Sequence, residues 1–213
     1  MSQLDSATAR VAPLARAHLP EAVGVLARAF AADPMLRWIM SASPAPMERG
    51  AQALFRFSCE VRLQLDWPLF GSFAGERLEA VAGVTALEDV PWPDSLRAVY
   101  DDLAAVIGPE ATVRLERYSA HADQYRPRGP HVHLGVLGVD PAAQRLGHGR
   151  ALLEAVEAWS DAQPASIGVW LDTENPSSRA FYERCGYRCV GATSVDGMRI
   201  WCMFRPRGGW SMV

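Results

Sequence analysis

Hydrophobic residues recur along the chain with two periods, one typical of helices and one typical of strands. Apolar positions at helical spacing predict helices over 20–31, 47–66, 95–107, 110–122 and 175–185, a helical turn at 35–40, and a further helix that carries Leu152, Val156 and Trp159. Apolar runs bounded by turn residues predict strands over 9–14, 69–74, 78–87, 131–139, 167–171, 187–193 and 198–204. Asp94 is expected to cap the helix that follows it.

The order of these elements predicts an α/β fold, in which a mixed sheet is covered by helices. Strands and helices fill the first half of the chain, and the second half runs β-α-β-α-β-β. No internal repeat and no long low-complexity linker divides the sequence. We therefore expect residues 1–213 to form a single domain.

The most informative stretch is His131–Leu153, which reads as a strand, a glycine-containing turn and the start of a helix. Asp140-Pro141 ends the strand, and the turn has the sequence Gln-Arg-Leu-Gly-His-Gly over 144–149. The start of a helix has unpaired N–H groups and a partial positive charge, which favour an anion. Glycines let a phosphate approach the backbone closely. The stretch predicts a pyrophosphate site, the alternative being an ordinary turn that uses glycine for its geometry.

Two common phosphate-binding motifs do not fit this stretch. In the dinucleotide fingerprint counted from Gly147, the third glycine falls at Leu152. The P-loop needs a lysine after its last glycine, and the 21 basic residues of this chain are all arginines. The absence of lysine also excludes Schiff-base and pyridoxal-type chemistry.

The turn Q-R-L-G-H-G resembles the acetyl-CoA signature Q/R-x-x-G-x-G/A of the GNAT superfamily of N-acetyltransferases. Downstream, Asn175 to Tyr187 resembles that superfamily's N…FYE-x-x-G-F/Y segment, in the same order along the chain. The segments AFAADP, YRPRGP and MRIWCMFRP resemble the branch that includes puromycin N-acetyltransferase. The resemblance implies a sheet of six or seven strands that is splayed near its centre, with acetyl-CoA in the splay. Gly135 and Gly138 would tolerate a bulge in the central strand.

The resemblance also implies which residues bind acetyl-CoA. The strand backbone at Leu137, Gly138 and Val139 would bond the pantetheine arm, and Asn175 would touch that arm, although it also suits a helix N-cap. The side chains of Arg145 and Arg150 either contact phosphate or are simply solvated. The backbone N–H groups of the turn would hold the pyrophosphate: Gln144, Arg145, Leu146, Gly147, His148, Gly149 and Arg150.

By the same resemblance, Tyr182 would donate a hydrogen bond to the departing coenzyme A sulfur, and the alternative is an aromatic core residue. An amine acceptor must also lose a proton. His131 and His133 share one face of the central strand, and His133 is one candidate base, with Glu174 as the other; a histidine at the surface or core edge is the alternative. Aromatic and apolar residues that would line the acceptor pocket, if they are not core, are Phe30, Met35, Trp38, Trp92 and Tyr118.

Composition narrows the remaining choices. The net charge of −3 and the lack of a basic block disfavour a nucleic-acid partner. No apolar run suits a signal peptide or a membrane span, so a cytoplasmic location is expected, and the four cysteines show no metal-type spacing, so no metal is expected. We expect a monomer or homodimer that transfers acetyl from acetyl-CoA to a primary amine of a small molecule by direct attack. The alternatives are a non-catalytic acyl-CoA sensor of the same fold and a protein or peptide N-acetyltransferase.

Overall fold

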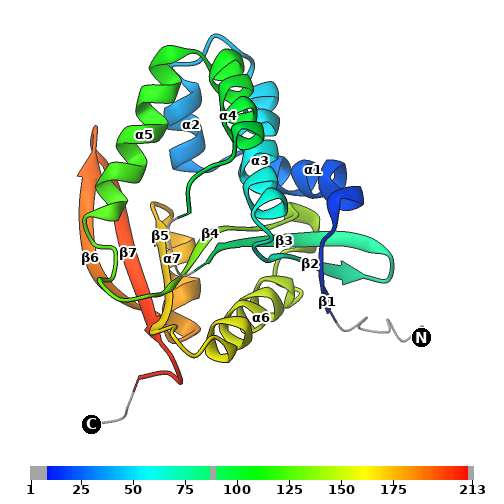
Figure 1. Cartoon of the computed structure of the whole chain (residues 1–213), viewed down its shortest axis with the longest axis vertical. Coiled ribbons are helices and arrows are strands. Elements are labelled where there is room, and N and C mark those ends of the chain that lie inside the picture. Colours follow the sequence, from blue (N-terminus) through cyan, green and yellow to red (C-terminus); the bar gives the residue numbers. More distant parts are fainter. Residues whose placement is uncertain (1–8, 87–89, 211–213) are drawn as a thin grey trace.

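The computed structural model describes residues 9–86 and 90–210, and in these ranges one seven-stranded sheet forms the centre of the molecule (Figure 1). The strand order is β1-β2-β3-β4-β5-β7-β6, and every neighbouring pair is antiparallel except β4 and β5. The bounds are β1 Arg10–Pro13, β2 Leu69–Ala74, β3 Arg77–Thr85, β4 Val132–Val139, β5 Gly168–Thr173, β6 Arg188–Val195 and β7 Met198–Pro206. The predicted α/β fold with a mixed sheet of six or seven strands is confirmed.

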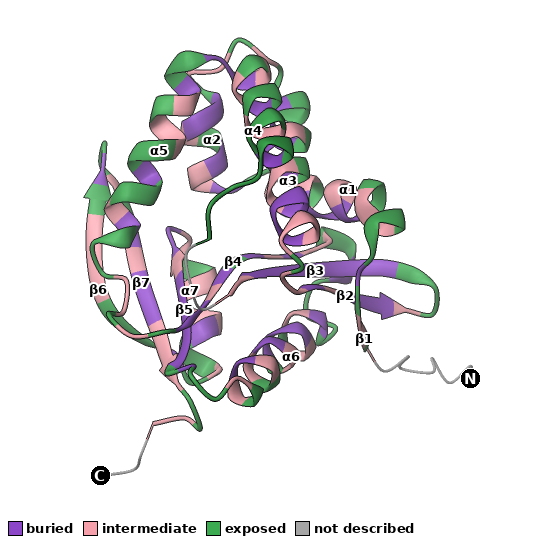
Figure 2. Cartoon of the chain, in the orientation of Figure 1, coloured by how far each residue is buried: buried purple, intermediate pink, exposed green. Residues whose placement is uncertain are grey.

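Helices cover both faces of the sheet, with their inward sides buried and their outward sides exposed (Figure 2). α6 and α7 pack on one face; α1 and α3 pack on the other, where α5 lies against β6 and β7. α2 and α4 lie farther from the sheet, against α3 and α5. The bounds are α1 Leu19–Ala29, α2 Pro34–Met40, α3 Met47–Gln64, α4 Asp94–Ile107, α5 Pro109–Asp123, α6 His148–Ala162 and α7 Pro176–Arg184, with short 3-10 turns at Arg16–His18 and Pro141–Ala143.

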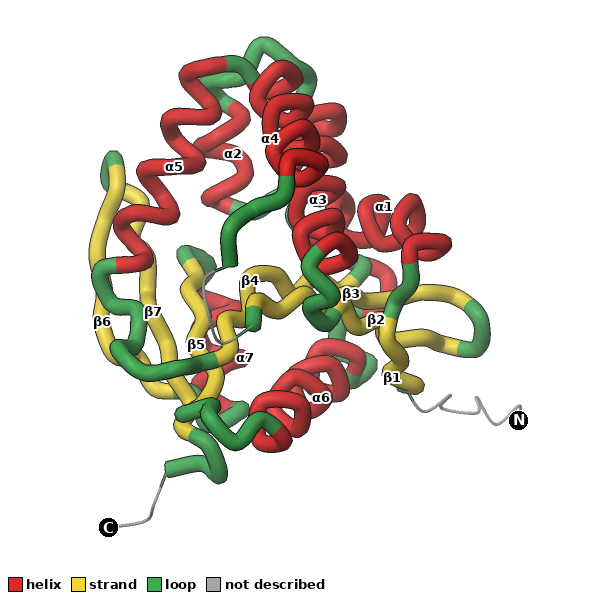
Figure 3. The backbone as a smooth tube through the Cα atoms, in the orientation of Figure 1, coloured by secondary structure: helices red, strands yellow, loops and turns green. Residues whose placement is uncertain are grey.

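The sheet is splayed between its two parallel strands, as the family resemblance implies. β4 and β5 pair only at Val132 with Val169 and at His133 with Trp170, and the strands then separate (Figure 3). The rest of β4 pairs with β3 alone. Its other edge therefore carries backbone groups that no strand in the described residues satisfies.

A bulge lies in β4 beside the start of this splay. The register with β3 passes from Leu134 to Val136, which leaves Gly135 without a partner. The extra residue reverses the alternation, so Leu134 packs toward α6 whereas Val136 packs toward α1 and α3. Of the two glycines predicted to tolerate a bulge, Gly135 carries it.

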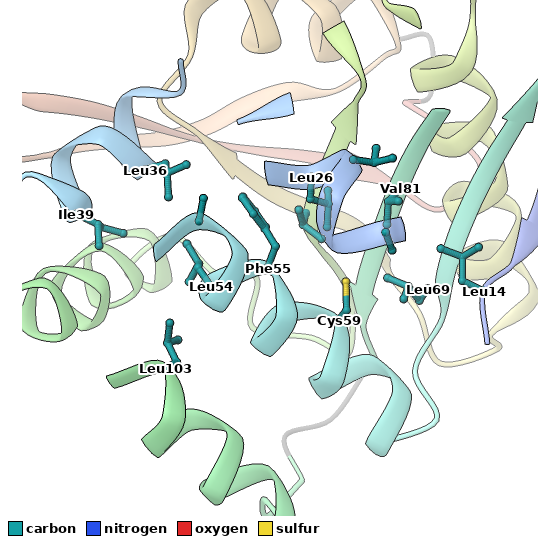
Figure 4. Close-up of a cluster of buried hydrophobic side chains, with 14 of the residues drawn as sticks. Leu14, Leu26, Leu36, Ile39, Leu54, Phe55, Cys59, Leu69, Val81 and Leu103 are labelled. Atoms are coloured by element: carbon teal, nitrogen blue, oxygen red, sulfur yellow. The ribbon is translucent and has the colours of Figure 1, made fainter. Parts of the chain in front are cut away.

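Two large hydrophobic clusters hold these layers together. One lies between the sheet and α1 to α3, and Figure 4 shows Leu26, Phe55 and Val81 within it. The other lies under α6 and α7 and includes Leu152 and Tyr182. No helix of the described residues is both long enough and apolar enough to cross a membrane.

Most element boundaries agree with the sequence prediction, but the assignment of Asp94 as a helix cap was wrong. α4 begins at Asp94 itself, Pro93 takes the cap position, and no side chain caps the helix. Pro93 has the extended backbone that precedes a helix, so α4 begins one residue earlier than predicted. The exposed Asp94 carboxylate therefore lies in the first turn of the helix. The last residue of the predicted strand 78–87 lies outside the described residues.

We predict that Leu26→Ala lowers the free energy of unfolding by about 2–5 kcal/mol, because Leu26 is fully buried in the cluster under α1 and its truncation leaves a cavity. Urea unfolding followed by circular dichroism measures the change. Leu146→Ala, at a side chain that is 68% exposed, is the matched control and should shift the value by less than about 0.5 kcal/mol. Equal losses in the two variants would contradict the assignment of this core.

Candidate active site

The free edge of β4 is the first component of the site. Beyond His133 the β5 side of this strand has no partner strand among the described residues, so its N–H and C=O groups face the splay. Leu137 and Val139 direct their half-buried side chains toward the cluster under α6 and α7. An unpaired edge binds an extended ligand through the backbone, whatever the side chains. The predicted pantetheine contacts at 137–139 are compatible with this geometry.

The turn after β4 forms the second component. Arg145 (φ 65°) and Gly147 (φ 93°) both adopt left-handed backbone angles, and α6 starts at His148. The Ala151 N–H donates to the Gly147 carbonyl at 3.0 Å, so the three N–H groups before it project from the helix end. A Cβ added at Gly147 would meet no heavy atom within 4 Å, which leaves open space for an anion beside these donors.

The side chains of this turn have different roles. Those of Gln144, Arg145, Leu146 and Arg150 are exposed. The His148 imidazole instead points into the protein, where Nδ1 lies 2.9 Å from Oγ of the buried Ser72. His148 therefore offers its backbone N–H to a ligand but not its ring.

α7 brings Asn175 and Tyr182 to the splay from the other side. Oδ1 of Asn175 accepts a hydrogen bond from the Ser177 N–H at 2.9 Å, so this side chain does act as a helix cap. Tyr182 is 7% exposed, and its ring packs against Phe181 and Tyr187 at centroid distances of 5.3 and 5.8 Å. Burial, together with the negative charges of nearby carboxylates, raises the pKa of Tyr182 far above its usual value, so its hydroxyl is a proton-bearing donor.

A cavity of about 590 Å³ lies on the opposite side of β4, under α3 and α5. His133, Gly135 and Val136 of β4 and Trp170 and Asp172 of β5 form its floor. Its wall is largely aromatic, made by Phe30, Phe55, Phe57, Trp92, Tyr100 and Tyr118. A second cavity, of about 620 Å³, lies between α1, α3 and α4 and contains none of the predicted site residues.

Of the aromatic residues predicted to line the acceptor pocket, Phe30 and Tyr118 do so and Trp38 does not. The indole of Trp38 lies outside the cavity lining, beneath the guanidinium groups of Arg114 and Arg117 at 5.3 and 5.9 Å from the ring centroid. Met35 and Trp92 also line the cavity.

Buried carboxyl groups meet beside the cavity floor. The Tyr118 hydroxyl lies 2.6 Å from Oδ2 of Asp172 and 2.8 Å from Oε2 of Glu174, and Glu174 is hydrogen-bonded to Asp33. Burial and the charge of Asp33 raise the pKa of Glu174 to about 8, and burial also raises the pKa of Asp33. Near neutral pH Glu174 therefore holds a proton, which it donates to Asp33.

The two predicted histidines both lie against Trp170, but only His133 lines the cavity. Nε2 of His133 lies 3.4 Å from Oδ1 of Asp172. His131 is buried, with Nδ1 at 2.7 Å from the Gly129 carbonyl oxygen. The structure thus brings His133, Glu174 and Tyr118 together around Asp172, whereas His131 lies to one side.

Asp33, Asp172 and Arg62 were not predicted. Asp172 had a signal in the sequence, because strand alternation places this lone acid on the face of Trp170. Arg62 also had one, since it follows Ser58 by one helical turn within an apolar stripe. Asp33 had none, because its neighbour Glu174 is far away in the sequence.

Comparison with known proteins agrees with this architecture. Residues 46–187 match the acetyltransferase (GNAT) family, and the chain belongs to this family, as its motifs predicted. Members of this family use acetyl-CoA as the acetyl donor. Within the described residues, no group of three or more His, Cys, Asp or Glu side chains is placed to hold a metal ion.

The chain is 34% identical over 120 residues to mycothiol acetyltransferase of Clavibacter sepedonicus, a match that covers 51% of this chain and only 37% of that protein. In structure it resembles histone acetyltransferase HPA2 and related acetyltransferase of Corynebacterium glutamicum (TM-score 0.70, 23% identity, 96% of this chain and 99% of the other). It also resembles the PaiA N-acetyltransferase of Thermoplasma acidophilum in complex with coenzyme A (TM-score 0.56, 13% identity, 93% and 99%). At these identities the two structures support the fold alone.

We predict that Glu174→Gln removes a pH dependence of stability. The pKa of Glu174 rises from 4.5 to about 8 on folding, so the folded chain binds one proton more than the unfolded chain between these values. The stability that this proton provides is complete below pH 4.5 and is lost as pH rises through about 8, by at most about 1.4 kcal/mol per pH unit. Glutamine mimics the protonated acid, so the stability of wild type relative to the variant should fall over this range.

Urea unfolding at several pH values between 5 and 9, read as the difference between wild type and variant, measures this effect. Glu76→Gln, at an exposed turn position, is the matched control and should give a constant difference. A constant difference for Glu174→Gln would show that the Glu174 carboxyl is ionised throughout.

Proposed function

We propose that the chain is an acetyl-CoA-dependent N-acetyltransferase whose acceptor is the primary amine of a small molecule, and that residues 1–213 act as one catalytic domain. The observation that supports this most directly is the arrangement around the splay. A free strand edge and a helix N-terminus lie on one side of it. On the other side, the floor of the aromatic cavity carries His133 beside Asp172. In this proposal the extended, phosphorylated donor binds along the splay, and the amine approaches it from the cavity.

Acetyl-CoA supplies an acetyl thioester, and the residues of the splay would hold it. In this proposal the backbone of Leu137, Gly138 and Val139 bonds the pantetheine arm, and Asn175 lies beside it. The N–H groups over 144–150 bind the pyrophosphate, which fits the open space at Gly147. This arrangement fixes the thioester with respect to the cavity floor, which is the positioning that direct attack needs.

Deprotonation of the amine is assigned to His133. The acceptor enters as an ammonium ion, which the negative charge of Asp172 attracts. Histidine is the side chain that most often acts as a general base, and Nε2 of His133 lies at the cavity floor, 3.4 Å from Oδ1 of Asp172. Glu174 is the weaker candidate, since at neutral pH it already holds a proton that it donates to Asp33.

Tyr182 is assigned to the departing sulfur. As the amine nitrogen bonds to the carbonyl carbon, the carbon–sulfur bond breaks and negative charge develops on sulfur. Proton transfer from a tyrosine of pKa near 10 to a thiolate of pKa near 8.5 is uphill by roughly 2 kcal/mol, and burial of Tyr182 increases this cost. Tyr182 therefore stabilises the sulfur as a hydrogen-bond donor and keeps most of its proton.

A small acceptor fits the cavity better than a protein chain. Tyr100 of α4, Tyr118 of α5 and Trp92 of the segment before α4 line the cavity, and this concave aromatic wall suits a compact apolar acceptor better than an extended polar peptide. A sensor that only binds acyl-CoA would need neither a base beside an acid nor a donor at the sulfur. The resemblance to the puromycin branch makes puromycin one acceptor to test.

We predict that Tyr182→Phe lowers kcat by about 10²–10³-fold, because one donor to developing charge is lost, while acetyl-CoA binds as before. Release of coenzyme A, detected with a thiol reagent across a panel of amines that includes puromycin, measures turnover. Tyr187→Phe, in the same buried cluster, is the matched control and should keep most of the activity. No turnover on any amine, with acetyl-CoA bound tightly, would instead favour the sensor.

His133→Gln should lower kcat/KM by about 10²–10⁴-fold, since the general base is removed. Coenzyme A release at saturating acetyl-CoA, followed over a range of acceptor concentrations, measures the loss. His121→Gln, on α5 and outside the cavity lining, should keep the wild-type kcat/KM. A wild-type kcat/KM in His133→Gln would assign the base to another group.

A further inference from the structure

Arg62 is a buried cation in the wall of the cavity, and the mechanism above does not use it. It lies near the end of α3 and is 7% exposed. Its guanidinium donates to the Val84 carbonyl (Nε, 3.3 Å), to the carbonyl and hydroxyl of Ser58 (Nη1, 2.9 and 3.1 Å), and weakly to the Thr85 hydroxyl (Nη2, 3.4 Å). These acceptors are all neutral, and Arg62 forms no ion pair with any described residue.

A buried guanidinium normally faces a carboxylate, because removing a charge from water is expensive unless an opposite charge compensates. Burial lowers the pKa of Arg62 only to about 10, so the group remains charged at neutral pH. The Arg62 cation, which no described residue balances with an ion pair, therefore lines a cavity that is otherwise mainly apolar on this side.

The bulge in β4 brings this cation to the cavity floor. A Cβ at Gly135 would overlap Nη2 of Arg62, so only glycine allows the guanidinium to lie here. The same Cβ would lie 3.7 Å from Cε1 of His133, which makes Arg62 and His133 neighbours across one glycine. Since His133 lies 3.4 Å from Asp172, the floor carries a cation, an imidazole and an acid in that order.

The acidic residues that line the cavity lie on the side away from Arg62. Asp172 is on β5, and Glu116 and Asp123 are on α5, where Glu116 accepts a hydrogen bond from Tyr100 at 2.9 Å. The cavity is thus polarised, with negative groups toward α5 and β5 and one positive group on α3. This polarity matches a molecule that carries an amine and an anion a short distance apart.

We propose that Arg62 binds a carboxylate of the acceptor, so that the acceptor is an amino-acid-like molecule whose carboxylate lies close to the reacting amine. This inference rests on the proposed function for the amine, while the anion site rests on Arg62 itself. The amine lies at His133 and Asp172, and Nη2 of Arg62 reaches the carboxylate over Gly135. Phe55, Phe57 and Trp92 then receive an aromatic or apolar side chain.

Binding of two probes that lack an amine tests the anion site without turnover. Titration calorimetry of the full chain with 3-phenylpropanoate and with 3-phenylpropanamide should show at least tenfold tighter binding of the carboxylate. Arg62→Met should abolish this preference and leave amide binding within threefold. Arg56→Met, at an exposed arginine of the same helix, is the matched control and should keep it. Equal affinities of the wild type for the two probes would overturn the proposal.

Two further variants separate charge from folding. Gly135→Ala keeps the charge of Arg62 but displaces its guanidinium, so it should weaken carboxylate binding and leave amide binding unchanged. Arg62→Lys should restore part of the preference that Arg62→Met loses. Equal weakening of both probes in these variants would assign Arg62 a purely structural role.

Coenzyme A release with phenylalanine and phenylalaninamide then links the anion site to the reaction. The proposal expects a kcat/KM at least tenfold higher for phenylalanine in the wild type, and a loss of that ratio in Arg62→Met. Acetylation of both compounds at equal rates would overturn the inference and leave the proposed function intact. Carboxylate binding with no acetylation of any amine would instead overturn the proposed function and leave the anion site standing.

Discussion

The short contact between β4 and β5 is the constraint on which the site depends. These parallel strands are joined at only two residue pairs, and beyond His133 and Trp170 each continues without the other. Unpaired backbone groups in a protein interior are costly, at about 1–3 kcal/mol each, unless a ligand or water satisfies them. This edge is where we propose that the extended pantetheine arm binds, and its N–H and C=O groups would then be satisfied by the ligand. The interrupted pairing between β4 and β5 thus splays the sheet and also creates the proposed donor site.

The bulge at Gly135 lets one strand serve both sides of the splay. Without the extra residue, Leu134 and Val136 would face the same cluster; with it, Leu134 packs under α6 and Val136 joins the cavity side. His133 and Val136 thus face the cavity, while Leu137 directs its backbone edge to the splay and its side chain to the opposite core. In a strand without the bulge, Val136 would point toward α6 and would not line the cavity. The missing Cβ also leaves the space that the Arg62 guanidinium occupies.

The features that the sequence predicted are those that depend on neighbours along the chain. The seven strands, the turn at Gly147 and the cap at Asn175 follow from periodicity, backbone chemistry and local spacing. The features it missed depend on contacts between distant segments. Asp33 meets Glu174 only because α2 packs near the end of β5, and Trp38 leaves the cavity because α5 supplies arginines to cover it. Neither contact has a local pattern that the sequence alone could show.

The electrostatics of the cavity are better explained by a ligand than by stability. Apolar residues of similar size in place of Asp33, Glu174 and Arg62 would avoid the cost of burying three polar groups, and such replacements of buried ionisable groups are often neutral or stabilising. Glu174 avoids its penalty by remaining protonated, and Asp33 shares that proton, so these two acids compensate each other within the chain. Arg62 cannot avoid its desolvation cost by becoming neutral, because its pKa stays far above neutrality. No described residue forms an ion pair with Arg62, and we propose that the carboxylate of the acceptor balances its charge.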